Sequence, residues 1–269
     1  MVNLTLLGGF DIRRSDGGAI DVPGQKDRAL LAILGIEPGQ TFTRDKLASL
    51  LWSDHGEQQA RDSLKHALTR LRRYFRAASP TTVITDRQSV RLDPAVVRSD
   101  VVTFEELVAK GSRQSLEQAT SLYRGDLLEG TRIRDSAFEE WLLFERQRLR
   151  RLAEEALTEL LTLIVASGDF ERIGGPAQKL ISIDPLNEQA YRAMMMAHAA
   201  HAQVPQALKL YEILCDGLRR EFGVMPARET EQLAERIRQG DRIVGSLSAE
   251  PSPVNIDGSG VSPVALPLP

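Results

Sequence analysis

The stretch RDSLKHALTRLRRYFR, residues 61–76, decides the fold of the first half of this chain. At about 100° per residue, its apolar side chains fall close to one direction, as they do on an amphipathic helix that buries one side. These side chains are Leu64, Ala67, Leu68, Leu71 and Phe75. We therefore expect a helix from about Gln58 to Arg76 whose apolar side joins a core.

The opposite side of this helix is basic. Six lysines and arginines in residues 61–76 face a single acid, Asp62. Guanidinium groups bind guanine edges and phosphates, and histidine or threonine can reach a base edge. A charged helix face taken alone is more often only solvated surface, so the neighbouring elements have to decide between the two interpretations.

The neighbouring elements follow the order of a winged helix-turn-helix. Helical spacing of apolar residues predicts a helix over residues 26–34, and Thr43 is placed to cap a second one. Two extended runs within residues 82–92 flank a turn and predict a hairpin. At the start of the chain, the alternation in residues 2–6 and a turn at residues 15–18, before Ile20 and Val22, predict a small antiparallel sheet.

In that order the third helix enters the major groove of double-stranded DNA and the hairpin forms a wing on the minor groove or the backbone. We predict phosphate contacts from Lys65, Arg70, Arg72, Arg76 and Arg87, and base readout from His66, Thr69 and Arg73. Arg61 completes the predicted DNA-binding set.

The charge of the chain supports a local basic surface only. The 34 lysines and arginines stand against 37 acids, a net of −3, which excludes a polycation that coats nucleic acid. Residues 1–100 hold 15 basic and 12 acidic residues, a net of +3, and the remainder holds 19 and 25, a net of −6. The single cysteine and the lack of a long apolar run predict a cytoplasmic protein without a membrane segment.

The second half is expected to be helical nearly throughout. A weak repeat with a period of 34 residues pairs Ile173 with Ala207, Ala177 with Tyr211 and Leu180 with Leu214. This period is typical of tetratricopeptide helix pairs. Such pairs either bind partner segments or only pack on one another, and the sequence leaves both open.

The predicted fold class is therefore mainly α, with an α+β winged helix followed by an all-α tetratricopeptide-like domain. The expected boundaries are a DNA-binding domain in residues 1–98, a helical domain in residues 99–243, and a proline-rich linker or tail in residues 244–269. The tail is expected to be disordered, and its proline-rich end suggests a connector, while whether a further module follows is left open.

Three motifs resemble the OmpR-type DNA-binding domain of the SARP bacterial transcriptional regulators: KDRALLA at 26–32, RDKLASLLW at 44–52, and residues 61–73. YRGDLLEG at 123–130, with Trp141, resembles the start of the bacterial transcriptional activator domain that follows in that family. The resemblance implies a recognition helix at residues 58–76 and a wing at residues 82–92. Residues 89–92, Ser-Val-Arg-Leu, depart from the usual Gly-Tyr-x-Leu end of the wing.

The same resemblance implies partners. It implies RNA polymerase opposite the loop at residues 53–57, a possible homodimer on direct repeats, and activation of transcription. The sequence holds no phosphate-binding loop, nucleophile elbow or zinc-protease motif, so we expect no cofactor, no metal and no enzyme activity. The alternative is a sensory or protein-interaction region of a larger multidomain protein, such as a nucleotide cyclase, in which the winged helix contacts protein.

Overall fold

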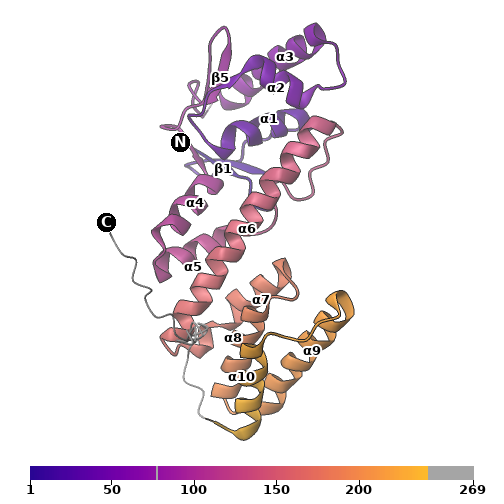
Figure 1. The fold of residues 1–269 in the computed structure, drawn as a ribbon. Helices are drawn as coiled ribbons and strands as arrows, with labels where there is room; N and C mark the ends of the chain where they lie inside the picture. The colour runs from indigo at the N-terminus through magenta and orange to yellow at the C-terminus, as the bar shows by residue number, and fades with distance from the viewer. Residues whose placement is uncertain (77, 242–269) are drawn as a thin grey trace, which may run out of the picture.

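The computed structural model describes residues 1–76 and 78–241, and the expected tail at 244–269 lies outside the described residues. An α/β unit lies at one end of an elongated molecule and a stack of helices at the other (Figure 1). The long helix α6 (Ser136–Ala166) runs between them. The mainly helical fold that the sequence predicts is confirmed.

Two small sheets frame the α/β unit. The first has the order β2-β1-β6 and the second the order β3-β5-β4. The strands are β1 (Val2–Thr5), β2 (Asp11–Arg14), β3 (Phe42–Thr43), β4 (Val83–Thr85), β5 (Ser89–Leu92) and β6 (Val97–Ser99). The predicted 82–92 hairpin is present, and β5 also pairs with β3.

The first sheet differs from the expected one in two respects. The strand that pairs antiparallel with β1 lies before the turn at residues 15–18, and only a bridge between Arg13 and Ala19 follows that turn. Gly8, with φ +90°, reverses the chain early enough for β2 to return along β1. The third strand, β6, pairs parallel with β1 from more than 90 residues away, with Val2 opposite Val97.

Three helices lie between the sheets in the predicted order. They are α1 (Gln25–Ile36), α2 (Arg44–Leu51) and α3 (Glu57–Phe75). The Oγ1 atom of Thr43 accepts a hydrogen bond from the Lys46 backbone N–H at 3.2 Å and caps α2 as predicted. The predicted apolar side of α3 is buried, with Leu64 and Leu71 at no more than 1% exposure.

The second half is a series of consecutively packed helices. Its elements are α4 (Asp100–Lys110), α5 (Arg113–Leu122), α6, a 3₁₀ turn at Phe170–Arg172, α7 (Gly174–Ile183), α8 (Glu188–Ala200), α9 (Val204–Phe222) and α10 (Arg228–Gln239). Five of the six residues paired by the repeat lie on α7 and α9, and all six except Tyr211 are buried. The chain therefore has a tetratricopeptide-like stack, with α10 packed at its end (Figure 1).

One continuous hydrophobic core joins the α/β unit to the start of α6. Phe138 and Leu142 of α6 belong to the same buried cluster as Leu47 and Leu51 of α2. Main-chain bonds add to this joint, because the Leu128 N–H donates to the Leu6 carbonyl at 2.9 Å. These contacts fix the orientation of the α/β unit on α6.

A partly buried carboxylate connects α4 to the residues that follow β1. Asp100, the first residue of α4, accepts hydrogen bonds from the backbone N–H groups of Leu6 at 2.8 Å and Leu7 at 3.0 Å. Burial raises the pKa of Asp100 above its ordinary value, and the hydrogen bonds only partly oppose this effect.

Among the described helices, none combines the length and the apolar character that a membrane span requires.

Candidate nucleic-acid interface

The core orients α3 so that its basic side faces outward. Six residues of α3 are buried against α1, α2 and β4, at positions that recur every three or four residues. The side chains of Lys65, His66, Thr69, Arg72 and Arg73 are exposed, as is Arg76 just beyond the helix end. The structure therefore brings six of the nine predicted DNA-binding residues to one exposed surface.

Arg70 is the exception on α3, because it turns toward the core. Its Nε donates to Asp27 Oδ2 at 2.8 Å and its Nη2 to Asp27 Oδ1 at 2.7 Å. The Asp27 side chain is fully buried, whereas that of Arg70 is 41% exposed. The hydrogen bond from Asp27 raises the pKa of Arg70 further above its ordinary value. Arg70 thus anchors α3 on α1 with two of its N–H groups.

Two more of the predicted residues already have partners. Arg61 forms ion pairs with Asp45 of α2 at 2.9 Å and with Glu57 of its own helix at 2.6 Å, and all three side chains are exposed. Arg72 donates from Nη2 to the Thr85 hydroxyl and so ties α3 to the wing strand β4. Thr69 donates its hydroxyl to the Lys65 carbonyl at 2.9 Å and keeps its oxygen as an acceptor.

The remaining predicted residues with nitrogen donors have no acidic partner among the described residues. Within residues 1–76 and 78–241, no acidic side chain forms an ion pair with Lys65, His66, Arg73, Arg76 or Arg87. The Arg73 guanidinium lies 5.8 Å from the Tyr74 ring centroid, a distance typical of a cation–π contact. Exposed cations without counter-charges on one surface are suited to an anionic polymer.

The wing turn has its own internal bracing. The Asp86 carboxylate accepts from the backbone N–H groups of Gln88 at 2.7 Å and Ser89 at 2.6 Å, and from the Ser89 hydroxyl at 2.6 Å. The bond from Ser89 Oγ, followed by those from the two N–H groups, lowers the pKa of Asp86. This Asx-type turn precedes Val90 of β5, and it holds Arg87 exposed at the tip.

Arg44 is a cation of this surface that the sequence reasoning missed. It opens α2, and its guanidinium donates to the Asp86 carbonyl from Nε at 3.1 Å and Nη2 at 2.9 Å. A hollow of about 480 Å³ lies between the start of α2, α3 and the wing turn, with Arg44, Lys65 and Arg87 among its lining residues. Only the basic character of the RDKLASLLW motif could have pointed to Arg44.

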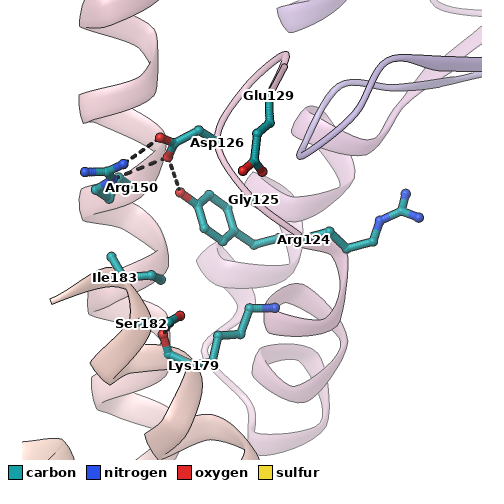
Figure 2. Close-up of a pocket in the computed structure, with 9 residues that line it drawn as sticks. Arg124, Gly125, Asp126, Glu129, Arg150, Lys179, Ser182 and Ile183 are labelled. Atoms are coloured by element: carbon teal, nitrogen blue, oxygen red, sulfur yellow. Dashed lines mark hydrogen bonds and ion pairs between the residues drawn. The ribbon is translucent and has the colours of Figure 1, made fainter. Parts of the chain in front are cut away.

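A second hollow lies at the joint between α5, α6 and α7 (Figure 2). Three of its polar side chains bind one another. Asp126 accepts from the Tyr123 hydroxyl at 3.1 Å and from Arg150 Nη2 at 2.5 Å, as the dashed lines show. Lys179 donates to the Thr120 carbonyl in the last turn of α5 and so caps that helix. These contacts make the second hollow a structural joint.

The architecture defines a class of protein: a winged helix with an outward basic recognition helix, mounted on a tetratricopeptide-like stack. Residues 97–238 match the bacterial transcriptional activator domain family, and the chain belongs to that family as a SARP-type transcriptional regulator.

Several bacterial regulatory proteins are similar to this chain in sequence at low identity. Regulatory protein AfsR of Streptomyces coelicolor is 25% identical over 87% of this chain, which spans only 24% of AfsR. Transcriptional regulatory protein MoaR1 of Mycobacterium tuberculosis is 23% identical over 92% of this chain and 83% of its own length. Regulatory protein DnrI of Streptomyces peucetius is 22% identical, with 89% and 93% covered.

A solved structure has the same fold. It is Mycobacterium tuberculosis EmbR in complex with a low-affinity phosphopeptide, with a TM-score of 0.70 at 20% identity. The similarity covers 90% of this chain and 66% of EmbR.

Proposed function

We propose that this chain activates transcription by binding double-stranded DNA in a sequence-specific way, with α3 in the major groove and the β4–β5 wing on the minor groove or backbone. One observation carries the proposal. Lys65, His66, Arg73, Arg76 and Arg87 are exposed on α3 and the wing without an acidic partner in the described residues, while the other side of α3 is buried.

The nine residues divide into roles by their surroundings. Lys65, Arg76 and Arg87 are proposed phosphate anchors because their charges are uncompensated, and Arg72 joins them from beside the wing. His66, Thr69 and Arg73 are proposed to read bases, since they occupy the outward side of α3. We propose that Arg61 and Arg70 lie at the margin of the DNA-binding surface. Each has guanidinium N–H groups that are not bonded to its acidic partners and that could bind phosphate.

The helical half is the proposed effector part. A stack of helix pairs offers a surface for partner segments, and we assign to it homodimer contacts on direct repeats. The loop between α2 and α3, at residues 53–57, is the proposed contact for RNA polymerase. We place the boundary between the two domains near residue 98, because the family match begins at residue 97. We place the site of action in the cytoplasm, which the regulatory names of the relatives support.

A gel-shift titration with genomic fragments at two salt concentrations tests the proposal. Lys65→Ala should weaken binding to all fragments alike and reduce the salt slope by about 0.9, the value for one phosphate contact. Arg73→Ala should cost specificity, by about 1–3 kcal/mol for a bidentate base contact. Arg151→Ala, a 76% exposed cation on α6, is the matched control. Unchanged affinity and slope in the Lys65→Ala/Arg73→Ala double variant would refute the assigned surface.

A further inference from the structure

Asp135, the residue before α6, holds a buried carboxylate against the α/β unit. Its side chain is only 2% exposed. Oδ1 accepts from the Ser53 hydroxyl at 2.8 Å, and Oδ2 accepts from the Ser53 backbone N–H at 3.2 Å and from Lys26 Nζ at 2.9 Å. A carboxylate this deeply buried is tolerated only with such donors.

Two of the three donors belong to Ser53, in the segment that leads into α3, and the third is Lys26 of α1. Ser53 is the residue after the C-cap Trp52 of α2, and α3 begins at Glu57. Lys26 also donates to the Leu51 carbonyl in the last turn of α2 and lies 6.0 Å from the Trp52 ring centroid. Asp135 therefore binds Ser53 directly and is linked to the end of α2 through Lys26.

The rest of this loop has little else to hold it. Asp54, His55 and Gly56 are exposed, and the His55 N–H reaches back only to the Trp52 carbonyl at 3.2 Å. Gly56 provides no side-chain cap for α3. Among the described residues, Asp135 is thus the side chain of the helical half that forms hydrogen bonds with this loop.

We propose that Asp135 is a positioning residue, through which the helical activator half sets the conformation of the α2–α3 loop. The assignment rests on the proposed function, in which that loop faces RNA polymerase. It deepens that function, because a partner that shifts the first turn of α6 would release Ser53 and so alter the loop. DNA binding by α3 would persist, since α3 is held by its buried apolar side chains and by its anchor at Arg70.

The contact of Asp135 with Ser53 is separable from the packing of α6. Phe138 and Leu142, at 1% and 6% exposure, bury the first turns of α6 in the shared core independently of Asp135. Loss of the carboxylate should therefore loosen the loop and leave α6 in place. Ser53→Ala makes a still smaller change, because it removes one hydroxyl and leaves the Lys26 ion pair intact.

The test compares the full chain with its Asp135→Ala, Asp135→Asn and Ser53→Ala variants in three measurements. These are amide hydrogen exchange at residues 53–56, gel-shift affinity, and transcription from a bound promoter fragment by purified RNA polymerase. Asp135→Ala should speed loop exchange about tenfold or more and lower transcription severalfold, with DNA affinity within about threefold of wild type. Asp135→Asn keeps an acceptor for Ser53, so the increase in loop exchange and the loss of transcription should both be smaller than in Asp135→Ala.

Asp126→Ala is the matched control, because Asp126 also lies at a joint between segments but bonds Arg150 and Tyr123. It should leave exchange at residues 53–56 unchanged. Wild-type loop exchange in both Asp135→Ala and Ser53→Ala would overturn the assignment, as would equal losses of DNA affinity and transcription. If the wild-type chain bound no DNA, the proposed function would be refuted. The exchange measurement would still test whether Asp135 holds the loop through Ser53.

Discussion

Arg70 and Asp27 form a two-bond ion pair beneath the basic surface of α3, at 2.8 Å and 2.7 Å. The pair joins the recognition helix to α1 across 43 residues of sequence. The Tyr74 hydroxyl, one turn further along α3, donates to the same carboxylate at 3.3 Å. The orientation of α3 toward DNA therefore depends on a carboxylate that lies out of reach of solvent.

Arg70→Ala should act on stability, because it strands the fully buried Asp27 carboxylate. We expect the free energy of unfolding to fall by about 2 kcal/mol, less than for a fully buried pair since Arg70 is 41% exposed. Arg73→Ala, three residues on, should stay within about 0.5 kcal/mol of wild type and yet weaken DNA binding. Urea titrations and gel shifts of both variants measure the contrast, and equal stability of the two would contradict it.

Asp86→Ala should weaken DNA binding even though it removes a negative charge from the DNA side. The reason is that Asp86 braces the wing turn and thereby holds Arg87 at the tip. Asp62→Ala is the electrostatic control: Asp62 contacts only Gln58 among the described side chains, so its loss should strengthen binding. Stronger binding by both variants in a gel shift would show that the wing bracing has no role.

The ion pair of Asp135 should make stability depend on pH on the acid side. Burial raises the pKa of Asp135, but the bonds from Lys26 and Ser53 outweigh burial and leave it below its ordinary value. A folded-state pKa below the unfolded value of about 3.9 means stabilisation that is full above that pH and is lost as pH falls through the folded pKa. The advantage of wild type over Asp135→Asn in urea titrations should therefore shrink below about pH 4. An advantage independent of pH would argue against an ionised Asp135.

Glu188→Ala should release α10 from the end of the stack. The Glu188 carboxylate accepts from the Ala227 backbone N–H at 2.9 Å and from the buried Thr230 hydroxyl at 2.6 Å, and so caps α10 from α8. We expect a loss of about 1–3 kcal/mol and faster amide exchange confined to α10. Glu235→Ala on the exposed side of α10 is the control. Exchange that rose equally throughout the chain would show that α10 is not a separate unit.

The local elements of this protein were predictable from its sequence. The buried stripe of α3, the Thr43 cap and the 82–92 hairpin each depend on residues a few positions apart, and periodicity and turn chemistry report such neighbours directly. The exposed basic side of α3 follows from the same periodicity, because burial of one side dictates the other.

Tertiary structure alone decided which polar groups meet across the fold. In the folded chain Arg70 forms an ion pair with Asp27, and Arg44 donates to the Asp86 carbonyl of the wing. Strand β6 pairs with β1, and Asp135 accepts a hydrogen bond from Ser53. Each partner is tens of residues away, and no local pattern encodes a hydrogen bond whose two halves are positioned by separate helices. The sequence by itself therefore determined the helices, the wing and the basic side of α3. The packing of α6 against α2 and of α3 against α1 determined which of the charged side chains support the fold and which remain exposed on the proposed DNA-binding surface.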